Sequence, residues 1–73
     1  MSSKIVINGI TRNIESPSIS YETVAELTHP KRDHRGLSMT WKRPDGASGI
    51  LSTGLEVRVA DGMVINAMYT GNA

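Results

Sequence analysis

Residues 49–73 read GILSTGLEVRVADGMVINAMYTGNA and carry the clearest structural signal in the chain. Between residues 55 and 59, apolar and charged side chains alternate, which is typical of a strand with one buried face. Asp61-Gly62 then predicts a turn, and the apolar run from Met63 to Tyr69 predicts a further strand. The sequence therefore predicts two consecutive strands in its last third.

The last predicted strand is followed by four small or polar residues: Thr70, Gly71, Asn72 and Ala73. We expect a domain over residues 1–69 and a flexible tail over residues 70–73. Four extended residues reach roughly 13 Å. This arrangement is expected where the carboxylate of the tail is the working group, and it also fits a domain that ends after its last strand.

Two shorter strands are predicted near the beginning of the chain. The run from Lys4 to Ile7 is rich in β-branched residues, and Asn8-Gly9 is a strong hairpin signal because both residues tolerate positive φ. Ile10 to Glu15 is the expected return strand, with Ile10 and Ile14 on one face. Pro17 closes it, because proline cannot donate to a strand ladder.

A short helix is predicted next, from Tyr21 to Leu27. Ser20 is a good N-cap residue, and Ile19 and Val24 have the spacing of a hydrophobic staple. Pro30 disfavours helical geometry in the residue before it, so the helix is expected to end there. The predicted length is about two turns.

The middle of the chain is expected to hold one further strand. Apolar and polar residues alternate from Leu37 to Lys42, whereas residues 43–49 form a turn cluster. Ile50-Leu51 is a short apolar step, and residues 52–54 are a second turn. Two hairpins flanking one helix predict an α+β fold with a mixed sheet of four to five strands. The first and last strands carry the densest apolar runs, which predicts parallel pairing in the middle of the sheet and hence a β-grasp fold.

The composition narrows the classes of function. A chain of 73 residues has a core worth only about 3 to 5 kcal/mol and little room for an enzyme cleft, so we expect no catalytic activity and no cofactor. There is no cysteine, and the net charge of +1 argues against a nucleic-acid partner. No apolar stretch reaches the roughly 20 residues of a membrane span, and no signal peptide is visible. We therefore expect a cytoplasmic protein that is monomeric when free.

The first and last strands are apolar on both faces. The set expected to face the helix is Ile5, Ile7, Met63, Ile65 and Ala67. The alternate set would then form an exposed patch of the kind that binds partner proteins, and its expected members are Val6, Val64 and Met68, with Trp41 at its margin. A covering loop is the alternative, and which set faces inward is open at this stage.

The loop after the helix is charged and carries both histidines. His29 and His34 flank a basic segment, which is a poor setting for a metal ion, so no metal site is predicted. The basic residues of this part of the chain are Lys31, Arg32, Arg35, Lys42 and Arg43. We interpret them as a solvated face, or as a rim that guides a partner enzyme.

The chain resembles bacterial ubiquitin-like proteins of the multiubiquitin type, which occur beside activating-enzyme, conjugating-enzyme and metalloprotease-like genes. The residues that carry the resemblance are Val6-Ile7-Asn8-Gly9, Ile19-Ser20-Tyr21-Glu22, Val24, Leu27, Leu37 to Trp41, Leu51 to Gly54, Val57 to Val59 and Asp61 to Asn66. The resemblance implies a ubiquitin-like modifier that is attached through its tail, with activating and conjugating enzymes and a processing or deconjugating protease as partners. It also suggests a bacterial pathway of the antiviral type.

The end of the tail departs from the ubiquitin pattern. Ubiquitin and the sulfur-carrier proteins end in Gly-Gly, whereas this tail reads Gly71-Asn72-Ala73. Either the activating enzyme accepts these side chains or a protease trims them first. Three functions therefore remain open: a conjugated modifier, a non-conjugated protein-binding module, and a sulfur carrier, which the missing Gly-Gly weakens most.

Overall fold

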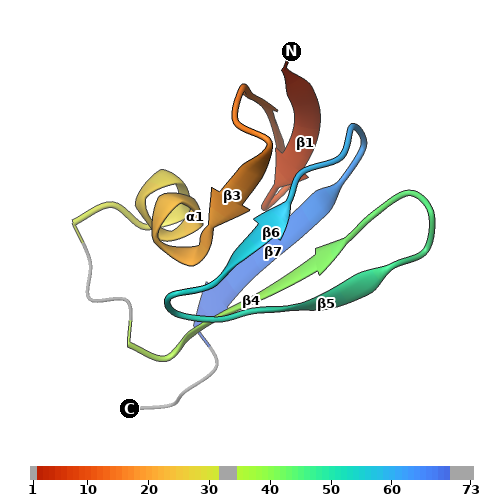
Figure 1. Cartoon of the computed structure of the whole chain (residues 1–73). Coiled ribbons are helices and arrows are strands. Elements are labelled where there is room, and N and C mark those ends of the chain that lie inside the picture. Colours follow the sequence, from red (N-terminus) through yellow and green to blue (C-terminus); the bar gives the residue numbers. More distant parts are fainter. Residues whose placement is uncertain (1, 32–34, 70–73) are drawn as a thin grey trace.

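The computed structural model describes residues 2–31 and 35–69, which form one helix and seven strands around a single core (Figure 1). The elements in chain order are β1 (Ser3–Ile7), β2 (Ile10–Ile14), β3 (Ser18–Ser20), α1 (Tyr21–Thr28), β4 (Leu37–Lys42), β5 (Ser48–Leu51), β6 (Glu56–Arg58) and β7 (Val64–Tyr69). The fold is thus α+β, with one helix and a mixed sheet, as predicted.

Five of the strands form the main sheet, in the order β2-β1-β7-β4-β5. β1 and β7 pair in parallel, with Val6 opposite Val64 and Ile7 opposite Ile65, whereas the other neighbours in this sheet are antiparallel. The predicted parallel pairing of the first and last strands is therefore confirmed. β3 and β6 form a separate two-stranded sheet.

Two predicted turns, Asn8-Gly9 and Asp61-Gly62, lie at the two ends of β1 and fix its position. Asn8 and Gly9 have φ values of 51° and 81°, as the hairpin between β1 and β2 requires. At the other end of β1, the N–H of Lys4 donates to the Asp61 carboxylate at 2.7 Å, and the Gly62 N–H donates to the Lys4 carbonyl, also at 2.7 Å. The Asp61-Gly62 turn therefore holds the start of β7 beside β1.

α1 begins at the predicted residue. The Ser20 hydroxyl accepts a hydrogen bond from the Thr23 N–H at 3.1 Å, which is the N-cap interaction and contributes about 1 kcal/mol. The helix continues to Thr28, one residue beyond the prediction, and the His29 N–H still donates to Ala25 at 2.8 Å. Pro30 follows immediately.

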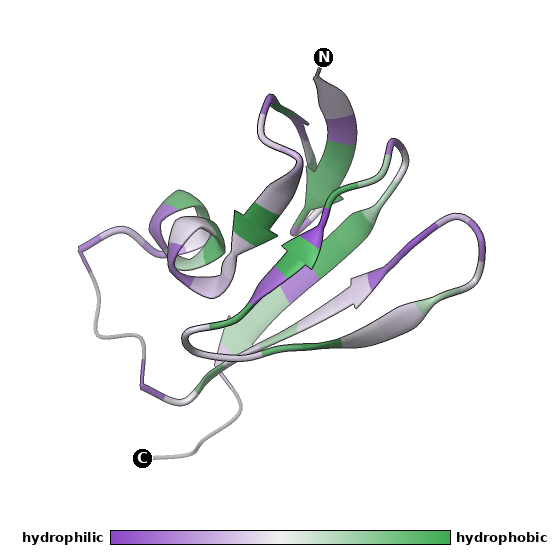
Figure 2. Ribbon diagram, viewed as in Figure 1, coloured by the Kyte–Doolittle hydropathy of each residue, from purple (hydrophilic) through white to green (hydrophobic). Residues whose placement is uncertain are grey.

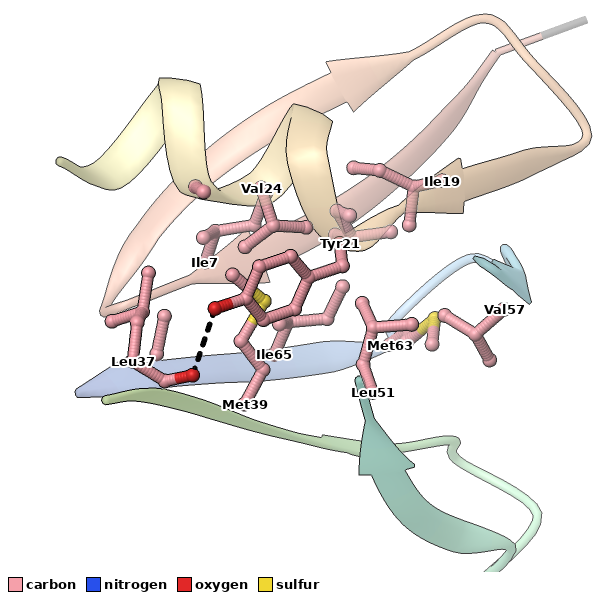
Figure 3. Packing of buried hydrophobic residues seen from close by; sticks show 13 residues of the cluster. Ile7, Ile19, Tyr21, Val24, Leu37, Met39, Leu51, Val57, Met63 and Ile65 are labelled. Atoms are coloured by element: carbon pink, nitrogen blue, oxygen red, sulfur yellow. Dashed lines mark hydrogen bonds between the residues drawn. The ribbon is translucent and has the colours of Figure 1, made fainter. Parts of the chain in front are cut away.

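The core lies between α1 and one face of the main sheet (Figure 3). Its buried members are Ile5, Ile7, Ile19, Tyr21, Val24, Ala25, Leu37, Met39, Leu51, Val57, Met63, Ile65 and Ala67. The five residues predicted to face the helix are all among them. Within the core, the Tyr21 hydroxyl donates to the Leu37 carbonyl at 2.9 Å, which satisfies a buried polar pair and ties the helix to β4. Figure 2 shows apolar segments on β1 and β7 and also on β3, β6 and α1, the elements that surround the core.

Three expectations about the strands were wrong. β3 and β5 were not predicted as strands, because β3 has only three residues and β5 contains Gly49. The strand over residues 55–59 shortens to β6. Leu55 precedes it, donates its N–H to the Ser52 carbonyl at 2.9 Å in a turn, and is 55% exposed. Finally, β6 and β7 do not pair with each other, since β6 pairs with β3.

Candidate functional site

α1 covers one face of the main sheet. We call the other face, which points away from the helix, the open face. In strand ladders, paired residues point to the same side and successive residues alternate. Because Val6 pairs with Val64, and Ile5, Ile7 and Ile65 are in the core, these two valines point to the open face. By the same alternation along β7, Asn66 and Met68 share this face. The predicted facing of both strands is therefore correct.

Apolar side chains run across the open face. Val6 and Val64 are half-buried at its centre, and Met68 is 60% exposed near the end of β7. Ile50 of β5 joins them, because it pairs with Thr40, which in turn pairs with Asn66. Ile50 is 72% exposed, the largest exposure among the large apolar residues that the structure describes.

Ile50 was missed because residues 48–51 were not recognised as a strand. The signal was nevertheless present in the sequence. Leu51 is in the core, and in an extended segment its neighbour must point to the other face. An apolar residue next to a buried one on an edge strand is therefore expected at the surface. Ile50 is such a residue, and it adds an apolar group on β5.

The charged residues of the open face all carry one sign. Lys4 precedes Val6 by two residues on β1, and Lys42 pairs with Val64, so both lysines point to this side. The face also holds uncharged polar residues, namely Thr11, Asn13, Ser38, Thr40, Ser48 and Asn66. On the strands that the structure describes, no carboxylate side chain points to the open face. The Asp61 carboxylate lies at the start of β1, where it accepts from the Lys4 N–H.

The predicted position of Trp41 at the margin of this patch is wrong. Trp41 pairs with Ile65 and with Gly49, so its side chain lies on the helix side of the sheet, where it packs against the core. Its ring covers Gly49, where an added Cβ would lie 2.7 Å from the indole ring. The Arg43 guanidinium lies over the ring, with Cζ 4.5 Å from the ring centroid. Trp41 therefore closes the edge of the core.

The predicted tail residues, Thr70, Gly71, Asn72 and Ala73, lie outside the described residues. The residues just before them make defined contacts with β4 and with the Asn8 side chain. Tyr69 pairs with Leu37 of β4, and its ring makes an edge contact with His29, with the ring centroids 5.0 Å apart. The carbonyl and N–H of Ala67 are both bonded to the side chain of Asn8. β7 is thus held by the Asn8 side chain as far as Ala67 on one side, and by β4 as far as Tyr69 on the other.

The basic residues that are close in sequence do not form one surface. Lys42 points to the open face, whereas Arg43 lies over Trp41 on the other face and donates to the Arg58 carbonyl at 3.1 Å. Lys31 follows the helix end and Arg35 precedes β4; both are exposed, and Arg32 and His34 lie outside the described residues. Among the described residues, no group of three or more His, Asp or Glu side chains is arranged to hold a metal ion.

A small hollow lies where β5 ends beside β4. It has a volume of about 170 Å³, below the roughly 300 Å³ of typical small-molecule sites. Its lining residues are Tyr21, Leu37, Ser38, Met39, Ile50, Leu51, Ser52 and Thr53. Tyr21 is engaged with Leu37, and no charged side chain lines the hollow. The open face is therefore the stronger candidate for a binding surface.

Comparisons with known proteins found no relative of this chain. Neither the protein-family models nor the curated proteins nor the solved structures yielded a match to this chain. The arrangement of residues described above is therefore the basis for any functional conclusion. In the part of the chain that the structure describes, no helix has the length and apolar character needed to cross a membrane.

Proposed function

We propose that this protein is a ubiquitin-like modifier with a β-grasp fold. In this proposal a cytoplasmic activating enzyme recognises the folded domain and activates the carboxylate of the tail, which a conjugating enzyme then transfers to a target. The observation that carries the proposal is the position of β7. It is the central strand, parallel to β1 and paired with β4, and residues 70–73 follow it directly.

In this proposal the modifier and its activating enzyme have different chemical tasks. A carboxylate is a poor electrophile until one of its oxygens becomes part of a leaving group, and adenylation by ATP provides that change. The nucleotide, metal and nucleophile are supplied by the partner enzyme. This protein presents the tail, with its reactive carboxylate at Ala73 or, after trimming, at Asn72 or Gly71. A central strand suits that task because its neighbours on both sides fix the point from which the tail starts.

The open face supports the same proposal by providing a surface for recognition. Val6, Val64, Met68 and Ile50 supply apolar groups on the open face, where Asn66 and Thr40 lie between them and Lys4 and Lys42 share the face. Val64 and Met68 lie on β7, the strand that leads to the tail. Exposed apolar groups of this kind are typical of protein-binding sites. The complementary partner surface would be apolar at its centre and acidic at its border.

The test is intact-mass spectrometry after the protein is mixed with ATP and its cognate activating enzyme. The full-length chain should form an ATP-dependent covalent adduct, and a variant lacking residues 71–73 should form none. The truncated variant should keep its thermal midpoint, because the deleted residues lie beyond the strand that holds the core together. An adduct that persists after truncation, or no adduct with the full-length protein, would refute the modifier function.

A second candidate is a binding module that is never conjugated. The exposure of Met68 and Ile50, at 60% and 72%, favours it independently of the tail, because a surface of this kind can bind partners without covalent chemistry. The same mixture distinguishes the two. A stable complex without a covalent adduct, formed equally by the truncated chain, is the result expected for a binding module.

A further inference from the structure

Asn8 and Gly9 form the turn between β1 and β2, and the Asn8 side chain is bonded to β7. Both residues have positive φ, at 51° and 81°, as a two-residue turn of type I′ requires. Oδ1 of Asn8 accepts from the Ala67 N–H at 2.7 Å, and Nδ2 donates to the Ala67 carbonyl at 3.0 Å. We call this two-bond contact the Asn8–Ala67 pair.

The same two residues form a chemically reactive step of the chain. In an Asn-Gly step the glycine nitrogen can attack Cγ of the asparagine, because glycine has no side chain to obstruct the approach. The new N–C bond closes a five-membered succinimide ring, the Cγ–Nδ2 bond breaks, and Nδ2 leaves as ammonia. Water then opens the ring at either carbonyl and gives aspartate or isoaspartate. The chain has one Asn-Gly step, since its other asparagines are followed by isoleucine or alanine.

We propose that Asn8 is a deamidation site that the folded chain keeps closed. The Asn8–Ala67 pair fixes the amide against β7 and holds Nδ2, the leaving nitrogen, through its bond to the Ala67 carbonyl. The turn adds a second restraint, because type I′ geometry sets ψ of its first central residue near about +30°. Cβ of Asn8 and the Gly9 nitrogen then lie on opposite sides of the Cα–C bond across which the ring must close.

Opening of the turn removes both restraints together. Hairpin ends open locally more often than a whole domain unfolds, and the Asn8 side chain is already exposed to the water that completes the reaction. The product cannot re-form the pair, since aspartate supplies only acceptors and isoaspartate adds a main-chain carbon to the turn. Deamidation at Asn8 therefore marks chains that have opened, and it leaves them with a weaker contact between the β1–β2 turn and β7.

The test compares the full chain in mildly alkaline buffer with and without guanidinium chloride at a concentration that unfolds it. Trypsin separates residues 5–12, which contain Asn8, from residues 13–31, which contain Asn13. Mass spectrometry of the two peptides against time measures the two rates, and a sample digested at once gives the background. We expect Asn8 to react at least about tenfold more slowly in the folded chain, because two hydrogen bonds must first break.

Asn13 is the internal control, because it is exposed on β2 and is followed by the β-branched Ile14. In the unfolded chain Asn8 should react much faster than Asn13. Gly9→Ala, measured only in guanidinium chloride where the turn is absent, should slow Asn8 because its methyl group obstructs the attacking nitrogen. Equal rates at Asn8 in the folded and unfolded chains would overturn the protection by the fold. A rate at Asn8 no faster than at Asn13 in the unfolded chain would overturn the site itself.

A pair of substitutions tests the consequence of the modification. Asn8→Asp reproduces the aspartate product, and Asn13→Asp makes the same chemical change at an exposed position without a bond to β7. Asn8→Asp should unfold at a lower denaturant concentration than the wild type, whereas Asn13→Asp should keep the wild-type midpoint. Equal midpoints for the two variants would overturn the claim that deamidation at Asn8 leaves a weakened fold.

Discussion

Both faces of the central strands carry large apolar residues, but the two faces have opposite surroundings. Along β1 and β7, Ile5, Ile7 and Ile65 are at most 1% exposed beneath α1, whereas their neighbours Val6 and Val64 are half-buried on the open face. Apolar residues occur on both faces, although Lys4 and Asn66 stand on the open one, and α1 covers only the other face. The comparison indicates that the covered face provides the stability of the domain and leaves the open face available for recognition. The predictions below test this division of roles between the covered face and the open face.

The largest effect is expected from a pair of neighbouring substitutions on β7. Ile65→Ala removes a fully buried side chain and should cost about 2 to 5 kcal/mol, which is comparable to the whole stability of a domain of this size. Val64→Ala removes two methyl groups that are already half-exposed and should cost about 1 kcal/mol. Urea denaturation followed by circular dichroism measures both. Equal losses for the two variants would contradict the division between the faces.

A smaller effect is expected where the covering helix is tied to the sheet. Tyr21→Phe removes the hydroxyl that donates to the Leu37 carbonyl and leaves that carbonyl without this donor inside the core. The expected loss is about 1 to 2 kcal/mol. In a domain of this size each kcal/mol lowers the thermal midpoint by about 4 to 8 °C, which a calorimetric scan resolves. An unchanged midpoint would mean that this hydrogen bond contributes little to the attachment of α1.

The smallest effect on stability is expected on the open face. Met68→Asp introduces a charge at a side chain that is 60% exposed, and its free energy of unfolding should stay within about 0.5 kcal/mol of the wild type. Leu55→Asp is the matched control, because Leu55 is 55% exposed and lies beside the helix, where its carbonyl accepts from the Tyr21 N–H. A loss above about 2 kcal/mol in Met68→Asp would show that the open face contributes to the folded state.

Local sequence signals were sufficient where the structure depends on neighbouring residues. The Ser20 cap, the Asn8-Gly9 turn and the alternation from Leu37 to Lys42 each predicted the element that the structure contains. The pairing of β1 with β7 was also predictable, because only a central position explains two strands that are apolar on both sides.

The errors concern features that depend on distant parts of the chain. Gly49 suggested a turn, but it lies in a strand because the Trp41 ring covers the space that a side chain would occupy. Trp41 was assigned to the wrong surface although Leu37 and Met39, four and two residues earlier, are in the core and share its face. The hydrogen bonds between the Asn8 side chain and the Ala67 main chain join residues 59 positions apart, and no local pattern in the sequence indicates them.

The central claim is that a partner enzyme recognises the open face in order to activate the tail. The most direct measurement is the rate of ATP-dependent adduct formation with the cognate activating enzyme, followed by intact mass, for the wild type, Met68→Asp and Leu55→Asp. We expect Met68→Asp to slow the adduct by about tenfold or more, equivalent to about 1.4 kcal/mol, and Leu55→Asp to keep the wild-type rate. Equal rates for the two variants, or a larger loss in Leu55→Asp, would contradict the claim.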